Sequence, residues 1–168
     1  MNKGEMEMEE RISTLALERW PLPDQEKVAA ALAAEAERSQ RQIVVLDDDP
    51  TRVHREIARN VADVAAELGR AYLIVSRGDS TLRGHYPLET ELLSEVFRKE
   101  TGRTVDGEIL CPYFKEGGRF TLDNVHYVRY GDELVPCGQT EFAGDETFGY
   151  QNSALPAYIE EKTGGKCR

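Results

Sequence analysis

The fold prediction starts from the stretch Ala71-Tyr72-Leu73-Ile74-Val75-Ser76-Arg77-Gly78-Asp79-Ser80-Thr81-Leu82-Arg83-Gly84-His85. Its first five residues are apolar and predict a buried strand. The next ten form a polar loop that holds two guanidiniums, one carboxylate, three hydroxyls and one imidazole. Arginine forks match the oxygens of a carboxylate or phosphate two at a time. The loop therefore predicts a binding site for a small polar anion, and the alternative is a polar turn with a local ion pair.

Helical and apolar patterns alternate on both sides of this stretch. A helix is expected after the N-cap residue Asp24, and the apolar run Ile43–Leu46 is typical of a buried strand. A helical pattern over Arg52–Leu68 follows, then the strand at 71–75 and a helix from Pro87 toward Lys99. The expected core face of the 52–68 helix comprises Val53, Ile57, Val61, Val64 and Leu68. This order is that of βαβ units, so we predict an α/β, Rossmann-like fold with a mostly parallel sheet flanked by helices.

The ends of the chain differ from this alternating part. Residues 5–20 have an acidic helical pattern, and a third strand of the parallel sheet is predicted at 107–111. The C-terminal third is expected to form β-hairpins beside the sheet, because short strand candidates there are separated by turn residues. These candidates are Arg119–Leu122, Val125–Tyr130 and Glu133–Val135, and a closing helix is predicted at Ala154–Lys162.

The composition limits the classes of partner. The 168-residue chain has a net charge of -10 and a pI near 4.9. An acidic surface argues against nucleic acid or an anionic membrane as the main partner. The chain shows neither a membrane-length apolar run nor a signal-peptide pattern, so a cytoplasmic protein is expected.

Cysteine and histidine suggest no metal site or disulfide framework. The three cysteines are odd in number and far apart, and the three histidines lack metal-ligand spacing. We interpret His54 as a surface residue of a helix. His126 alternates with apolar residues and is interpreted as a hydrogen-bonded strand residue rather than a catalyst.

A second polar loop, Asp47-Asp48-Asp49-Pro50-Thr51, follows the strand at 43–46. In parallel sheets, ligands bind beyond the carboxyl ends of the strands, so both polar loops are expected at one edge. Adjacent carboxylates repel one another and need a cation or a hydroxyl-rich ligand. The alternative is an acidic turn whose side chains cap the following helix.

Two other functions are compatible with these loops. Asp47-x-Asp49-x-Thr51 also matches the short motif of haloacid-dehalogenase-type magnesium phosphatases, in which Asp47 would be the nucleophile. Neither Lys99 nor Lys115 is well placed as the lysine of such an enzyme. A non-catalytic binding or assembly module is the second alternative. It would use the alanine-rich face of residues 29–36 to dock on a second copy of the chain, although internal packing of that face is favoured.

Taken together, the motifs resemble the N-terminal domain of the four-carbon acid sugar kinases. Val44–Thr51 is similar to that family's first strand and acidic loop, and Asp79-Ser80-Thr81-Leu82-Arg83-Gly84 to its most specific motif. Segments of the C-terminal part fit the same family. These are Gly117-Gly118-Arg119, His126-Tyr127, Thr140–Ala143 and Asp145–Ser153.

The resemblance implies a domain that binds a four-carbon sugar acid such as threonate, erythronate or an oxo-tetronate. A separate nucleotide domain with ATP and Mg²⁺ would supply the phosphoryl group. The carboxylates Asp48 and Asp79 are the candidate catalytic residues, as acceptors of the hydroxyl proton. The expected substrate-binding residues are Asp49, Arg77, Ser80, Thr81, Arg83 and His85.

The chain departs from the family pattern at two points, and these lead to the predicted domain organisation. Residues 1–40 are predicted to form a helical segment and residues 41–168 an incomplete sugar-acid-binding domain. Thr51 joins the next helix directly, as if an internal stretch of the family domain were missing, and no phosphate-binding glycine motif follows. The expected partners are therefore the sugar acid and a nucleotide-binding domain or intact homologue. We expect the chain alone to bind its ligand without transferring phosphate.

Overall fold

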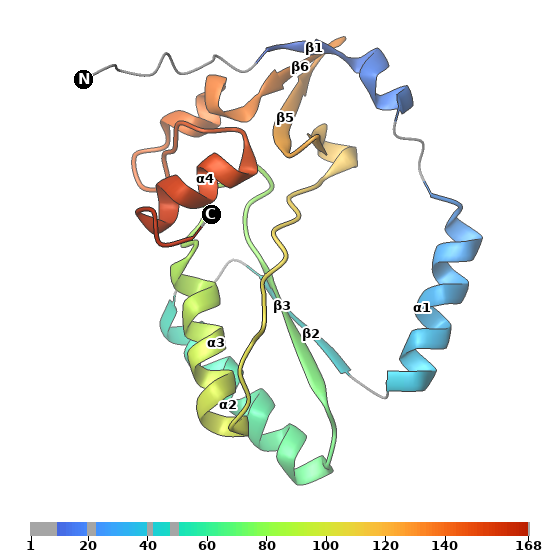
Figure 1. Cartoon of the computed structure of the whole chain (residues 1–168), viewed down its shortest axis with the longest axis vertical. Helices are drawn as coiled ribbons and strands as arrows, with labels where there is room; N and C mark the ends of the chain where they lie inside the picture. Colours follow the sequence, from blue (N-terminus) through green and yellow to red (C-terminus); the bar gives the residue numbers. More distant parts are fainter. Residues whose placement is uncertain (1–9, 20–22, 40–41, 48–50, 168) are drawn as a thin grey trace. The chain divides into compact units, whose positions relative to one another are not determined.

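The computed structural model describes residues 10–19, 23–39, 42–47 and 51–167. These fall into two compact units. The sheet unit contains the described residues of 1–19, 80–83 and 110–168, and the helical unit contains those of 20–79 and 84–109. Figure 1 labels helices and strands of both units.

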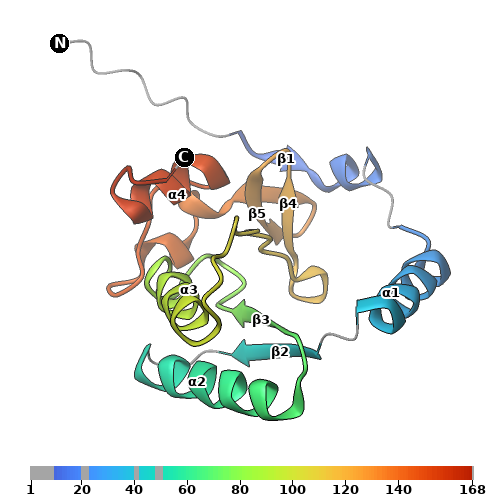
Figure 2. The ribbon, with the colours of Figure 1, turned by 60° about the horizontal axis from the view of Figure 1, so that its bottom comes forward.

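The helical unit is built around one pair of parallel strands, and Figure 2 shows the two pointing the same way. The strands β2 (Gln42–Asp47) and β3 (Tyr72–Arg77) are connected through α2 (Thr51–Leu68). The helix α3 (Leu88–Thr101) follows β3 and packs along α2. The predicted strands and helices at these positions are confirmed. Gly69, at φ +60°, provides the left-handed residue at which α2 stops.

The core between α2 and α3 lies on a different face of α2 from the one predicted. Ala58 packs against Leu92, Leu93 and Val96 of α3, with Ile57 and Ile74 at the edge of this cluster. The small side chains of Ala58 and Ala62 let α3 approach closely, so the fully buried row on α2 is His54, Ala58 and Ala62. At the far end of the predicted face, Val64 and Leu68 are exposed.

The surface assignment of His54 is therefore wrong. Its side chain is 1% exposed, because it lies one turn before Ala58 on the row that faces α3. The ring nitrogens of His54 have no hydrogen-bond partner among the residues that the structure describes.

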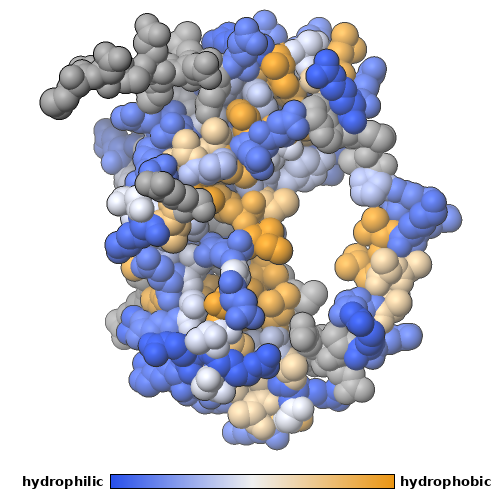
Figure 3. Space-filling view, viewed as in Figure 1, coloured by the Kyte–Doolittle hydropathy of each residue, from blue (hydrophilic) through white to orange (hydrophobic). Residues whose placement is uncertain are grey.

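The helix α1 (Gln25–Ser39) begins as the sequence predicts. The Asp24 carboxylate accepts hydrogen bonds from the backbone N–H groups of Glu26 at 3.0 Å and Lys27 at 3.3 Å, which is an N-cap. Figure 3 shows apolar side chains gathered along one side of this helix, and Val28 and Leu32 are exposed.

The sheet unit contains a four-stranded antiparallel sheet in the order β1-β6-β5-β4. Its core is formed by Phe120, Leu122, Tyr127 and Leu134. The 3-10 turn η1 (Thr14–Arg19) follows β1, and the helix α4 (Leu155–Thr163) lies near the end of the chain. The strands are β1 (Ile12–Ser13), β4 (Arg119–Leu122), β5 (Val125–Tyr130) and β6 (Glu133–Pro136), and the short 3-10 turns are η2 (Lys115–Gly117), η3 (Cys137–Gln139) and η4 (Glu141–Gly144).

The predicted Rossmann-like, mostly parallel sheet is wrong. The larger sheet is entirely antiparallel, and the described parallel pairing is confined to β2 and β3. The third parallel strand expected at 107–111 does not form, and Ile109 within it is 92% exposed. The strands expected as hairpins beside a sheet instead form the larger sheet themselves. They are joined by β1, which lies in a segment expected to be helical and pairs Ile12 with Leu134 of β6.

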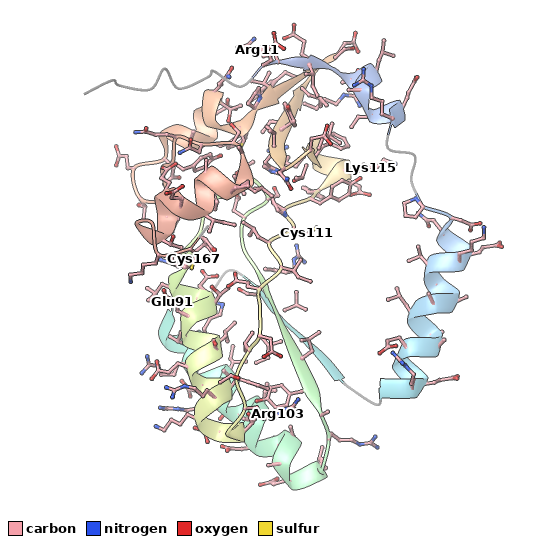
Figure 4. The ribbon with its side chains drawn as sticks, viewed as in Figure 1. Arg11, Glu91, Arg103, Cys111, Lys115 and Cys167 are labelled. Carbon is pink, nitrogen blue, oxygen red and sulfur yellow. The ribbon has the colours of Figure 1, made fainter. Side chains whose placement is uncertain are left out.

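None of the helices among the described residues combines the length and apolar composition that crossing a membrane requires. The three cysteines form no disulfide bond, and Cys111 and Cys167, labelled in Figure 4, are exposed.

Candidate functional site

The polar loop after β3 is divided between the two units. Ser80, Thr81 and Arg83 belong to the sheet unit, whereas Arg77, Asp79 and His85 belong to the helical unit. The structure therefore fixes two local arrangements, each within its own unit. Asp48 and Asp49, predicted at the edge of the parallel sheet, lie outside the described residues.

In the helical unit, the loop is held by a buried carboxylate that was not predicted from the sequence. Glu89, in the first turn of α3, is 9% exposed. Its two oxygens accept hydrogen bonds from the Ser76 hydroxyl and from the backbone N–H of His85, each at 3.2 Å. Glu89 thus connects the end of β3 to the end of the loop. The available signal was an acidic residue just after Pro87, since carboxylates favour helix N-termini.

The predicted site residues of the helical unit precede Glu89 in the sequence. Arg77 ends β3, is exposed, and lies opposite Asp47 in the parallel register. Asp79 is half-buried and His85 is exposed.

In the sheet unit, three consecutive carbonyl groups of the loop accept hydrogen bonds from buried side chains. The Ser80 carbonyl oxygen lies 2.8 Å from His126 Nε2. The Tyr150 hydroxyl donates to the Thr81 carbonyl at 2.6 Å, and the Tyr158 hydroxyl donates to the Leu82 carbonyl at 2.9 Å. The three donors come from β5, from the loop before α4 and from α4. They fix the backbone of 80–82 at three points.

The backbone conformation of Leu82 is unusual. Its φ is +64°, in the left-handed region, which costs a non-glycine residue about 1–2 kcal/mol. The Leu82 side chain is only 5% exposed, and its burial together with the Tyr158 hydrogen bond offsets that cost.

The orientation of His126 is set on both sides of its ring. Because a carbonyl oxygen only accepts, Nε2 must carry a hydrogen that it donates to Ser80. The other nitrogen, Nδ1, lies 2.9 Å from the Thr121 hydroxyl, which also lies 2.6 Å from the Pro112 carbonyl. With 0% exposure and these partners, His126 is the hydrogen-bonded strand residue that the sequence predicts.

Arg83 is the charged side chain that the anchored loop presents. Its Nε donates to the Thr81 hydroxyl at 3.2 Å, and its Nη1 lies 3.7 Å from the Asp145 carboxylate. Its guanidinium carbon lies 5.2 Å from the centre of the Phe142 ring, within cation–π range. The Arg83 side chain is 31% exposed, so the guanidinium is held in place while part of it faces solvent. Thr81 itself is 1% exposed, and in this structure its hydroxyl positions Arg83.

The acidic and aromatic segment 140–150 supplies the partners of Arg83. The Asp145 Oδ1 atom accepts from the backbone N–H groups of Thr147 and Phe148, both at 2.9 Å, while Oδ2 faces Arg83. This turn fixes the carboxylate that pairs with the arginine. From the sequence, Thr140–Ala143 and Asp145–Ser153 fit the family pattern, but no role in the site was predicted for them.

Tyr130 and Glu141 form a second polar contact of this segment. The Tyr130 hydroxyl donates to Glu141 at 2.6 Å. Partial burial and this hydrogen bond raise the pKa of Tyr130 to about 12. The same bond lowers the pKa of Glu141 below its ordinary value.

The described residues do not provide a metal site. They contain no group of three or more histidine, cysteine, aspartate or glutamate side chains that would hold a metal ion. Lys115, considered for the phosphatase alternative, is an exposed residue of η2 (Figure 4).

The anchored arginine and its surroundings fit a domain that binds a small anionic ligand. The family described as "Sugar-binding N-terminal domain" matches residues 47–168, which is most of the chain. The chain belongs to this family, the sugar-binding N-terminal domain of the four-carbon acid sugar kinases. The resemblance identified from the sequence is thereby confirmed. No curated protein and no solved structure in the comparisons matches the chain.

Proposed function

We propose that this chain binds a four-carbon sugar acid of the threonate or erythronate type, and that Arg83 takes its carboxylate. The observation that carries the proposal is the placement of Arg83. It extends from a loop fixed at three carbonyl groups, and Thr81, Asp145 and Phe142 hold its guanidinium. Such preorganisation lowers the entropy that binding costs. A guanidinium is also the side chain whose geometry best matches a carboxylate.

The hydroxyl groups of the ligand would be recognised by the remaining polar residues of the loop. We propose Arg77, Ser80 and His85 for this role, together with Asp49. Thr81 would contribute by positioning Arg83. A polyol offers several hydroxyls, so acceptors and donors in one loop suit a sugar acid better than a simple carboxylic acid.

Binding measurements test this proposal directly. Calorimetric titrations with threonate and erythronate should show binding, whereas erythritol, which has the same carbon number but no carboxylate, should bind far more weakly. Replacing Arg83→Ala removes a charge-assisted hydrogen bond, worth about 1.5–3 kcal/mol, so the affinity should fall by about ten- to a hundredfold. Arg83→Lys should retain part of the affinity, because lysine keeps the positive charge but lacks the paired N–H donors of the guanidinium.

Arg129→Ala is the matched control. Arg129 lies in β5 of the same unit, is exposed, and donates from Nε to the Gly131 carbonyl at 2.9 Å. Its replacement should leave the affinity for threonate within about twofold, as expected for a surface site. Equal binding of erythritol and threonate, or full affinity in Arg83→Ala, would rule out the proposal.

In a complete kinase we propose Asp48 and Asp79 as the residues that accept the proton of the reacting hydroxyl. The nucleotide would come from a separate domain, with the ATP and Mg²⁺ that the family implies. Asp79→Asn should keep the affinity for the acid and lose phosphorylation when a nucleotide-binding domain of the family is supplied. Phosphorylation at the wild-type rate by both Asp79→Asn and Asp48→Asn would eliminate this role.

A further inference from the structure

A second arginine lies on the same aromatic ring as Arg83. Arg119, the first residue of β4, is half-buried, and its guanidinium carbon lies 5.0 Å from the centre of the Phe142 ring. The Arg83 guanidinium carbon is 5.2 Å from that centre. The two guanidinium carbons therefore cannot be farther apart than the sum of these distances. Two cations therefore share one aromatic ring.

The Phe142 ring is held by its own segment. Phe142 lies in η4, whose first residue, Glu141, accepts the hydrogen bond of Tyr130. On the other side of Phe142, the backbone N–H of Ala143 donates to the Thr140 carbonyl, and the Ala143 carbonyl accepts from the N–H of Tyr150. Phe142 is thus fixed on both sides in the chain and supports the two guanidiniums.

The position of Arg119 is also fixed by the backbone. One of its terminal nitrogens, Nη1, donates to the Gly117 carbonyl. Gly118, at φ +73°, turns the chain into β4, and a Cβ there would lie 3.2 Å from the Cβ of Arg129. The Gly-Gly-Arg sequence is therefore what brings Arg119 to this place, because a side chain at 118 would strain the turn.

The two arginines differ in the carboxylates that lie near them. Arg83 has Asp145 at 3.7 Å. For Arg119, no carboxylate within 4.0 Å is found among the residues that the structure describes, and its buried Nε has no hydrogen-bond partner there. The Arg119 charge helps to lower the pKa of Glu141, but that carboxylate lies beyond 4.0 Å, and the buried Nε donor remains unfavourable until an acceptor arrives.

We infer that Arg119 is a second anion-binding residue of the site, which acts with Arg83 on either a carboxylate or a phosphate group of the ligand. This inference rests on the proposed function, since it assigns a further residue to the same site. An oxyanion would supply the acceptor for Arg119 and reduce the repulsion between the two guanidiniums. The carboxylate of a sugar acid and a phosphate group share this chemistry.

The test compares Arg119→Ala and Arg119→Lys with the Arg129→Ala control by calorimetry, using threonate and inorganic phosphate as separate ligands. The control is well matched because both arginines lie in the same sheet and each donates to a glycine carbonyl. If the carboxylate is the partner, Arg119→Ala should weaken threonate binding by about tenfold. If phosphate is the partner, the same loss should appear with phosphate alone. Arg119→Lys should show a smaller loss of the same kind.

The inference is overturned if Arg119→Ala binds both anions as the wild type does. If Arg119→Ala does not fold, Arg119→Lys and Phe142→Leu are measured in its place. Wild-type affinity for both anions in these two variants also overturns the inference. Failure of the proposed function looks different, because the wild type itself would then not bind threonate. Phosphate binding that depends on Arg119 would in that case still support the anion site.

Discussion

The hydrogen bonds that hold the loop at 80–82 allow a sharp test of how the site is built. Tyr150→Phe and Tyr158→Phe each remove one hydroxyl and leave the ring in place. The lost partners are the carbonyls of Thr81 and Leu82, at 2.6 and 2.9 Å. The two tyrosines are 5% and 2% exposed, so water does not readily replace the hydroxyl.

The expected magnitude follows from this burial. A buried carbonyl that loses its donor costs about 1–3 kcal/mol, so each variant should lower the free energy of unfolding by that amount. For a chain of this length, each kcal/mol corresponds to a fall in melting temperature of about 2–4 °C. Both variants should also bind threonate more weakly, because the loop that carries Arg83 loses one of its three fixed points.

Tyr130→Phe is the matched control, since it makes the same chemical change at a hydroxyl that is hydrogen-bonded but exposed. Tyr130 is 42% exposed, and loss of its hydroxyl should cost under about 0.5 kcal/mol. Urea denaturation followed by circular dichroism measures all three variants, and calorimetry measures their affinities. If the two buried tyrosines cost no more than Tyr130, the loop is not held as described.

Two further predictions concern other contacts of the structure. Glu89→Gln keeps the shape of the side chain but leaves one oxygen for the two donors, the Ser76 hydroxyl and the His85 backbone N–H. The free energy of unfolding should therefore fall by about 1–3 kcal/mol. Stability equal to that of the wild type in urea denaturation would contradict this role. The pKa of Tyr130 is raised from 10.0 to about 12, mainly by burial and then by Glu141, so the folded chain keeps this proton where the unfolded chain loses it. Its contribution to stability is complete below pH 10 and is lost as the pH rises through about 12, and Tyr130→Phe should flatten the stability curve over that range. An unchanged curve in the variant would show that another group titrates there.

Local sequence patterns predicted the positions of α1, α2, α3 and α4, whereas the helical pattern at 5–20 was wrong for β1. The Asp24 cap gave the start of α1, and Gly69 gave the end of α2. These features act between residues a few positions apart, so they can be read from the chain directly. The polar loop was found in the same way, from the density of charged and hydroxyl groups after an apolar run.

Pairing between distant residues was the part that could not be predicted. The segment 107–111 is apolar enough for a strand but finds no partner in the sheet, and Ile109 remains exposed. Ile12 forms a strand only because Leu134 of β6 lies beside it. Strand propensity describes a fit to a sheet surface, and the sheet itself is assembled from distant segments.

By itself, the sequence determined the positions of α1 to α4, the location of the polar loop and the family to which the chain belongs. The tertiary structure alone decided which side chains complete the site. His126, Tyr150 and Tyr158 reach the loop from 46 to 76 residues away, and Phe142 gathers Arg83 and Arg119 on one ring. The physical reason is that a hydrogen bond or a cation–π contact depends on distance in space, which a local pattern of residues does not encode.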